Sequence, residues 1–199
     1  MSTQSPLRVG VLVFDGVEEL DAVGPWEVLA SWAQRSSLRP EVLTFSADGA
    51  GVRCAKGLSL VPDTGAEDVG PLTVLVHPGG RGTRTLLTDE THLAWVRRMR
   101  ARTPLMTSVC TGALVYAAAG LLAGRPATTH HSALDALVTA EPSVLVDTDA
   151  RFVDDGDLIT SAGVSAGIDM ALHLVARLES TDAALAVRRD LQYDPLPPV

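Results

Sequence analysis

A cysteine stands where an apolar, strand-like run passes directly into a helix-forming segment. The run 105–109 ends at Cys110, and Thr111 and Gly112 lead into residues 113–119. Such a turn places a sulfur at the carboxyl edge of a sheet, near the unpaired N–H groups of a helix start, which favour the thiolate. The sequence therefore predicts that Cys110 is a nucleophile.

A glycine-rich loop precedes the cysteine and could serve the same edge. Residues 77–80 read His-Pro-Gly-Gly and follow a strand-like run, so their backbone can turn sharply towards a ligand. With the N–H of Thr111, the amides of Gly79 and Gly80 would form an oxyanion hole that binds substrate. An ordinary turn is the alternative interpretation, and the arrival of Cys110 on the next strand favours the site.

Acidic residues crowd the loop after the first expected strand: Asp15, Glu18, Glu19 and Asp21. Short charge runs of this kind usually form solvated surface. Asp21 stands where the chain becomes apolar and enters a helix, so it could cap that helix. Burial beside a thiol would instead raise its pKa and let it transfer a proton, and the two roles can coexist.

Two later segments complete the candidate pocket. Residues 127–131 read Ala-Thr-Thr-His-His, so His130 could reach the same edge and contact the thiol. No metal-ligand spacing accompanies this histidine pair, and we expect no metal. Residues 163–169 are glycine-rich but lack phosphate-binding spacing, so no nucleotide cofactor is expected. Gly163 and Val164 are instead expected to turn into a helix that lines the substrate pocket.

Strand-like bursts alternate with helical periodicity, which is typical of an α/β protein with a largely parallel sheet. Strands are expected at 9–14, 41–45, 57–61 as a short edge strand, 73–77, 105–109 and in a hairpin of 151–153 with 158–160. Helices are expected at 22–33, 92–102, 113–119, 166–178 and 182–189. The proline-rich tail, at about 192–199, should lie extended over the surface or a partner subunit.

Composition indicates one domain over residues 1–199, because 46% apolar and 20% charged residues suit a single core. A net charge of −8 argues against nucleic acid or an anionic membrane as partner, so a small-molecule substrate is expected. Cys54 and Cys110 cannot make a disulfide framework and fit a reducing compartment. With no leader-like start or long apolar run, we expect a cytoplasmic protein.

The motifs described above, in this order, resemble the ThiJ/PfpI superfamily, whose fold is related to class I glutamine amidotransferases. The resemblance spans nearly the whole chain and is carried by residues 13–29, 78–80, 108–112, 127–130 and 163–169. It implies a three-layer, flavodoxin-like α/β sandwich with a mainly parallel central sheet. Because members are commonly dimers, it also implies a homodimer, with Trp26 and the C-terminal tail as candidate contacts.

Within the superfamily, Cys-Thr-Gly together with Leu-Asp in the first loop looks most like isonitrile hydratase, which converts an isocyanide and water into an N-substituted formamide. The resemblance implies that Cys110 attacks the isocyanide carbon to form a thioimidate. It implies further that Asp21 positions water and handles the proton, and that Thr111 supports the intermediate. Protease-like members carry histidine directly after the cysteine, so Thr111 argues against a peptidase.

Other interpretations stay open. Glyoxalase and deglycase members usually present a glutamate to the cysteine, and Glu18 and Glu19 keep that activity possible. The domain also resembles the amino-terminal half of transcription regulators, but an acidic chain of 199 residues disfavours direct DNA binding. A low-pKa Cys110 could instead be a redox sensor that oxidises reversibly.

Overall fold

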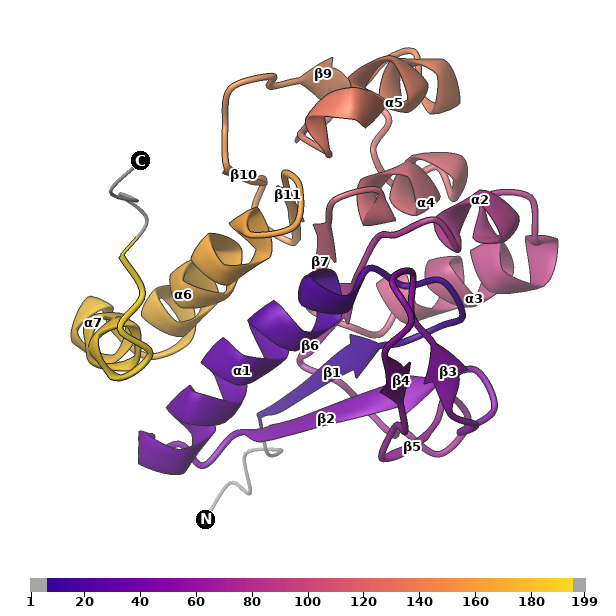
Figure 1. The fold of residues 1–199 in the computed structure, drawn as a ribbon. Helices are drawn as coiled ribbons and strands as arrows, with labels where there is room; N and C mark the ends of the chain where they lie inside the picture. Colours follow the sequence, from indigo (N-terminus) through magenta and orange to yellow (C-terminus); the bar gives the residue numbers. More distant parts are fainter. Residues whose placement is uncertain (1–6, 195–199) are drawn as a thin grey trace.

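A seven-stranded sheet forms the middle layer of the molecule in the computed structural model, which describes residues 7–194 (Figure 1). The strand order is β10-β11-β7-β6-β1-β2-β5, and β10 pairs antiparallel to β11 whereas the other pairs are parallel. The strands are β1 (Arg8–Leu12), β2 (Glu41–Ser46), β5 (Thr64–Gly65), β6 (Val74–His77), β7 (Leu105–Val109), β10 (Phe152–Asp154) and β11 (Leu158–Ser161). The expected fold class and the terminal hairpin are both confirmed.

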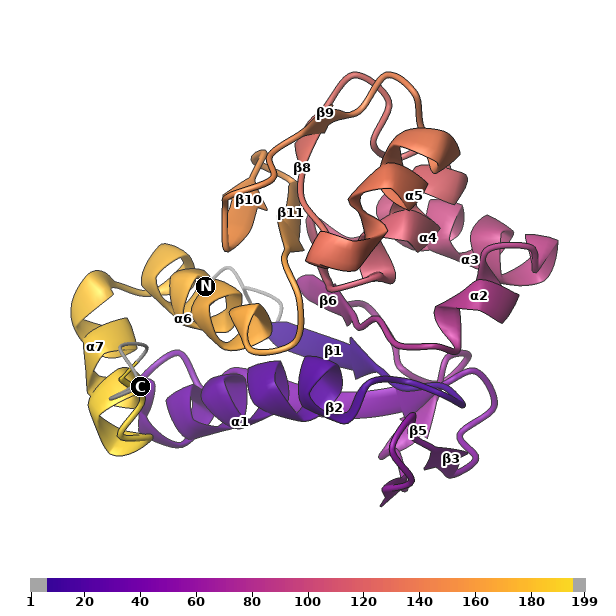
Figure 2. The ribbon, with the colours of Figure 1, turned by 45° about the horizontal axis from the view of Figure 1, so that its top comes forward.

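Helices cover both faces of this sheet, which gives the three layers visible in Figures 1 and 2. One face is covered by α1 (Glu19–Arg35), α6 (Ala166–Leu178) and α7 (Thr181–Asp190), and Trp32, Met170 and Leu174 are buried there. The other face carries α2 (Thr83–Leu86), α3 (Glu90–Arg100), α4 (Gly112–Ala118), the 3-10 turn η1 (His131–Ala133) and α5 (Leu134–Ala140).

Two small sheets lie outside the main one. Strand β3 (Val52–Arg53) pairs with β4 (Ser59–Leu60), and β8 (Pro126–Ala127) pairs with β9 (Leu145–Val146). The expected edge strand at 57–61 is therefore misplaced, since β5 forms the edge of the main sheet. The reason is a tight turn, in which Cys54 N–H donates to Leu58 O at 2.8 Å and directs β4 back onto β3.

The two central strands deliver the candidate site. Every residue of β6 and β7 is buried, as expected for parallel strands covered on both faces. His77 pairs with Ser108 in this register, so the loop after β6 and the turn after β7 leave the sheet side by side. In parallel sheets this carboxyl edge is where ligands bind.

The start of α1 differs from the expected one, and most of the expected C-terminal tail lies outside the described residues. Helix α1 begins at Glu19, three residues before the expected start, which places Asp21 inside its first turn. Of the expected extended tail, residues 195–199 lie outside the described residues. Among residues 7–194, no helix is long and apolar enough to cross a membrane, and no three His, Cys, Asp or Glu side chains cluster as metal ligands.

Candidate functional site

Cys110 occupies a strained turn between β7 and α4. Its φ angle of 55° lies in the left-handed region, which costs a non-glycine residue energy and is common at functional sites. The Cys110 N–H is placed between Ser161 O and Ala162 O, at 3.1 Å from each, and the Thr129 hydroxyl donates to Cys110 O at 2.7 Å. The neighbouring segments therefore fix the turn that the sequence predicts.

The environment of the sulfur contradicts the expected helix-activated thiolate. The backbone amides of Thr111 and Val164 donate towards the sulfur and lower its pKa. Burial has the larger effect, and with the charge of Asp21 it raises the pKa of Cys110 to about 12. The cysteine is only 6% exposed, so desolvation of the anion outweighs the hydrogen bonds from these two backbone amides. In the free site Cys110 is a neutral thiol.

Asp21 is a fully buried carboxyl beside this thiol. Gly79 N–H donates to Asp21 Oδ2 at 2.9 Å, and Cys110 also hydrogen-bonds the carboxyl. Burial dominates over both contacts and raises the pKa of Asp21 to about 7. The expected capping role is wrong, because Glu18 occupies the N-cap position and Asp21 is the third residue of α1.

The Gly79 and Gly80 amides are already engaged, which corrects the expected oxyanion hole. Gly79 N–H is bonded to Asp21, and Gly80 N–H donates to Thr111 Oγ1 at 2.9 Å. The Thr111 hydroxyl also lies 3.1 Å from Thr83 Oγ1. Thr111 therefore ties the glycine loop to the cysteine turn through its hydroxyl, while its backbone N–H serves the sulfur.

A cavity of about 430 Å³ opens beside the sulfur. Among the expected site residues it is lined by Cys110, Thr111, Gly80, His130 and Val164, whereas Asp21, Gly79 and Gly163 are not part of its lining. Other lining residues were not predicted from the sequence, namely Arg81, Thr83, Arg84, Leu87, Leu114, Ser132, Ala133 and Ala136. The sequence signal for some of them is proximity to a motif. Arg81, Thr83 and Arg84 follow the glycine loop, and Leu114 follows the Cys110 turn.

His130 and the turn at Val164 form one wall of the cavity. The His130 Nδ1 lies 2.8 Å from Ser132 Oγ, and no hydrogen bond joins this ring to the thiol among the described residues. The ring packs so closely on Gly163 that a side chain there would collide with it. Val164 has a φ angle of 48°, a strained conformation for a β-branched residue, and this aims its amide at the sulfur.

The two glutamates next to Asp21 face other partners. Glu18 lines the cavity but forms an ion pair with Lys56, and Glu19 Oε1 accepts the Lys56 backbone N–H at 2.7 Å. Backbone hydrogen bonds outweigh burial and lower the pKa of Glu19. The carboxyl that reaches the sulfur is thus an aspartate.

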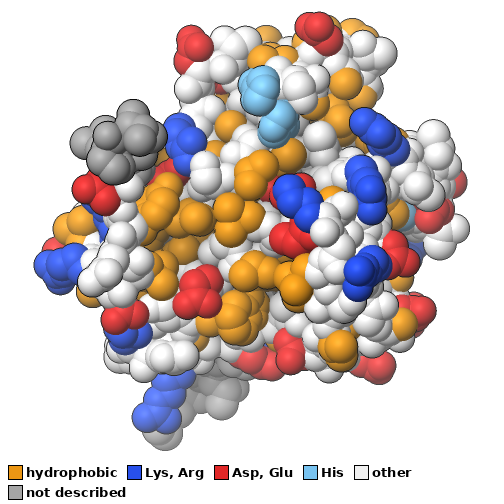
Figure 3. All heavy atoms as spheres, viewed as in Figure 1, with side chains coloured by type: hydrophobic (Ala, Val, Ile, Leu, Met, Phe, Trp, Pro, Cys, Tyr) orange, Lys and Arg blue, Asp and Glu red, His pale blue; other side chains and the backbone are white. Residues whose placement is uncertain are grey.

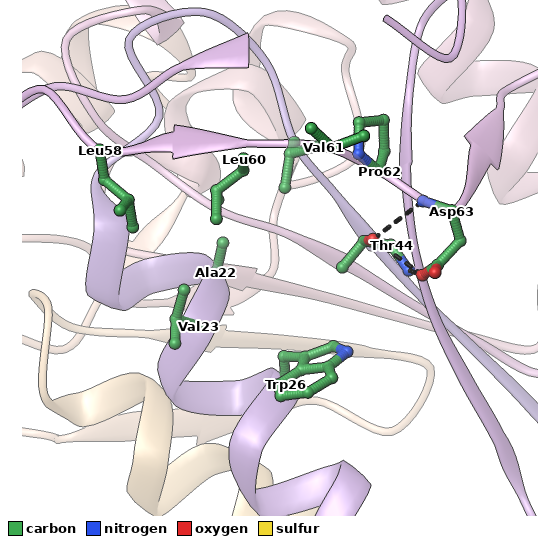
Figure 4. Close-up of a pocket in the computed structure, with 10 residues that line it drawn as sticks. Ala22, Val23, Trp26, Thr44, Leu58, Leu60, Val61, Pro62 and Asp63 are labelled. Carbon is green, nitrogen blue, oxygen red and sulfur yellow. Dashed lines mark hydrogen bonds between the residues drawn. The ribbon is translucent and has the colours of Figure 1, made fainter. Parts of the chain in front are cut away.

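A second hollow, of about 400 Å³, lies between α1 and the β4 segment (Figure 4). Its walls are Val23 and Trp26 on one side and Leu58, Leu60 and Val61 on the other. The Asp63 carboxylate at its end is occupied by the backbone N–H and hydroxyl of Thr44, at 2.8 and 2.9 Å. This hollow is apolar, and the reactive pair lies outside its lining.

The chain is similar to known proteins over nearly its whole length. The DJ-1/PfpI family model matches residues 7–177. An isonitrile hydratase from Pseudomonas putida is 42% identical over 192 residues, which are 96% of this chain and 81% of that protein. A transcriptional regulator of Pseudomonas aeruginosa, GbdR, is 29% identical over 96% of this chain but only 52% of its own length. A THiJ/PfpI family crystal structure from Pseudomonas syringae has a TM-score of 0.87 and 35% identity, covering 98% of this chain and 78% of the other.

The packing at Gly79 generates a stability prediction. A Cβ there would lie 2.5 Å from Thr111 N and 2.9 Å from Asp21 Oδ2, so Gly79→Ala must displace the loop. Because one of these contacts is with backbone, we expect a loss at the upper end of the usual range for overpacking, about 3 kcal/mol in the free energy of unfolding, measured in urea. Gly120→Ala is the control, because open space surrounds that glycine and only its positive φ is penalised, at about 1 kcal/mol. Equal losses in the two variants would contradict the packing.

Asp21 generates a pH-dependent prediction. Its pKa of about 7 lies above the unfolded value of 3.8, so its contribution to stability is full below about pH 4 and is lost as pH rises through 7. Asp21→Asn should therefore raise the melting temperature at pH 8 and leave it nearly unchanged at pH 4. The gain is at most about 4 kcal/mol. Asp135→Asn on the exposed face of α5 is the matched control. A destabilised Asn variant at pH 8 would refute the buried-carboxyl assignment.

Proposed function

This chain belongs to the DJ-1/PfpI family, and we propose that it hydrates isocyanides to N-substituted formamides at Cys110. The observation that carries the proposal is the buried Asp21–Cys110 pair next to a cavity that admits a small molecule. The isonitrile hydratase relative supports the same reaction, because its similarity extends over 96% of this chain.

The terminal carbon of an isocyanide accepts both a nucleophile and a proton, and the pair supplies both. As the sulfur attacks, the thiol proton passes to the Asp21 carboxylate, and the S–C bond forms. Asp21 then returns this proton to the former isocyanide carbon, which gives a thioimidate, Cys110–S–CH=N–R. The amides of Thr111 and Val164 stabilise the negative charge on sulfur during the attack.

Water completes the reaction. Asp21 accepts a proton from water as the water oxygen adds to the thioimidate carbon, and passes that proton to the nitrogen. The C–S bond then breaks, the hydroxyl proton of the adduct passes through Asp21 to the sulfur, and the formamide leaves. One isocyanide and one water give one formamide with no net oxidation. A carboxyl with a pKa of about 7 is suited to both directions of transfer near neutral pH.

The other interpretations receive less support. The glutamate that lines the cavity, Glu18, is paired with Lys56, which weakens a glyoxalase role. A readily oxidised sensor cysteine needs thiolate character, and the raised pKa of Cys110 opposes that. The chain spans about half the length of the transcriptional regulator GbdR, so a role in transcriptional regulation does not follow from that similarity.

Turnover of a neutral isocyanide tests the proposal. Purified protein should convert cyclohexyl isocyanide to N-cyclohexylformamide, followed by chromatography with mass detection. Cys110→Ala should abolish turnover, and Asp21→Asn should lower kcat/KM by about 100-fold or more. Cys54→Ala removes the other buried free thiol and should keep the activity. Turnover of methylglyoxal without turnover of any isocyanide would instead establish the glyoxalase alternative.

We further propose that a second copy of the chain covers the apolar hollow at Trp26. Val61 is 84% exposed and Leu58 48% exposed, so the wall beside the hollow projects apolar side chains. A two-fold contact brings the projecting wall of one copy to the hollow of the other, which is the self-complementary geometry of a symmetric dimer.

Light scattering tests the dimer. We expect twice the chain mass for the wild type and the mass of a single chain for Val61→Glu, because a charge would be buried in the contact. Val138→Glu is the control, since Val138 is 45% exposed on α5 and should stay dimeric. A wild-type protein with the mass of one chain would refute the contact.

A further inference from the structure

Two arginines, Arg81 and Arg84, line the cavity of Cys110. Arg81 and Arg84 are exposed residues beside the glycine loop, and both belong to the cavity lining. Neither guanidinium makes an ion pair or hydrogen bond with any residue of the described chain, 7–194. By contrast, Arg125, Arg151 and Arg177 are each paired with aspartate. The two guanidinium groups at the cavity are therefore free to bind a ligand.

The other ionisable groups of this lining leave that positive charge uncompensated. Glu18 is neutralised by its ion pair with Lys56. Burial and the neighbouring His131 lower the pKa of His130, so its ring is neutral at pH 7. The Asp21 carboxyl is not part of the cavity lining, and its raised pKa reduces its charge near neutral pH. The cavity lining therefore carries local positive charge, although the chain as a whole has a net charge of −8.

The face of the molecule agrees with this assignment. Figure 3 shows several Lys and Arg side chains over the α2 side, with Asp and Glu side chains beside them, and a pair of histidines and an apolar patch nearby. Leu87 and Leu114 belong to the same cavity lining as the two arginines. A ligand with an apolar stem and an anionic end matches this combination of side chains.

We propose that the preferred substrate is an isocyanide whose substituent carries a carboxylate, bound by Arg81 and Arg84. The assignment rests on the proposed function, because the isocyanide carbon must meet the Cys110 sulfur. The substituent on nitrogen then extends away from the sulfur, along the cavity wall that contains the two arginines. Guanidinium groups bind carboxylates through two parallel N–H donors, so a carboxylate is favoured over a neutral end group.

Alkylation of Cys110 tests the charge preference without the hydratase reaction. Iodoacetate and iodoacetamide react identically: the S–C bond forms, iodide leaves and the thiol proton is lost, but only iodoacetate is anionic. The rate of Cys110 alkylation by iodoacetate is divided by the rate with iodoacetamide, both followed by peptide mass spectrometry. This ratio should fall about 3- to 10-fold in Arg81→Gln/Arg84→Gln. Raising the salt concentration should lower the wild-type ratio as well.

Arg98→Gln is the matched control for the alkylation ratio. Arg98 is exposed on α3, lies outside the cavity lining and makes no ion pair within the described residues. Its loss removes one positive charge from the exposed surface, against two in the double variant, and should leave the ratio within about 1.5-fold of the wild type. A double variant with the wild-type ratio, or an Arg98 variant with an equal fall, would overturn the proposal.

Turnover of a matched substrate pair tests the assignment directly. Isocyanoacetate and its methyl ester differ by one charge, and the wild type should favour the acid in kcat/KM. The double variant should lose about 3- to 10-fold of that preference, mainly through KM. If kcat/KM for the ester equals kcat/KM for the acid, the carboxylate assignment is wrong and the hydratase function stands. If neither compound nor cyclohexyl isocyanide is hydrated, the proposed function itself fails.

Discussion

The hydrogen bond from Gly79 N–H to Asp21 Oδ2 is the interaction on which the site depends. It joins the first turn of α1 to the loop after β6, and it fixes the buried carboxyl beside the turn after β7. A carboxyl without this donor would lie in an apolar core at a high desolvation cost. With it, Asp21 retains an accessible charged form and a pKa of about 7, which a proton-transfer group requires.

Backbone strain at two positions directs the amides around the sulfur. Cys110 and Val164 both have positive φ angles, and both belong to segments that leave the carboxyl edge of the sheet. Fully buried β7 and the bonds to Ser161 and Ala162 stabilise the first turn. The core thus provides the rigidity that keeps a strained, reactive turn in place, in agreement with the usual location of such strain.

The sequence predicts the central elements well and the electrostatics poorly. Strand β7 and helix α6 have their expected bounds, because buried strands and amphipathic helices leave strong patterns. The start of α1 was misjudged because its N-cap, Glu18, makes no side-chain capping bond. That error made Asp21 look like a cap. The high pKa of Cys110 could not be predicted, since desolvation depends on the segments that cover the sulfur.

The residues of the pocket were also predicted only in part from the sequence. Motif residues such as Thr111 and His130 do lie at the cavity, but the Gly79 and Gly80 amides have partners that only the tertiary structure reveals. Arg81 and Arg84 belong to no motif and carry no periodic signal. Their importance follows from the fact that neither guanidinium has an ion-pair or hydrogen-bond partner among residues 7–194, and a sequence cannot show that.

The pH dependence of Cys110 alkylation by iodoacetamide tests the central claim most directly. If Asp21 and Cys110 share a proton, the wild-type rate should rise through about pH 7 and then level off until the thiol itself ionises at much higher pH. Asp21→Asn should remove the step near pH 7 and leave a rate that increases steadily with pH. A wild-type profile without that step, or a variant that keeps it, would contradict the account.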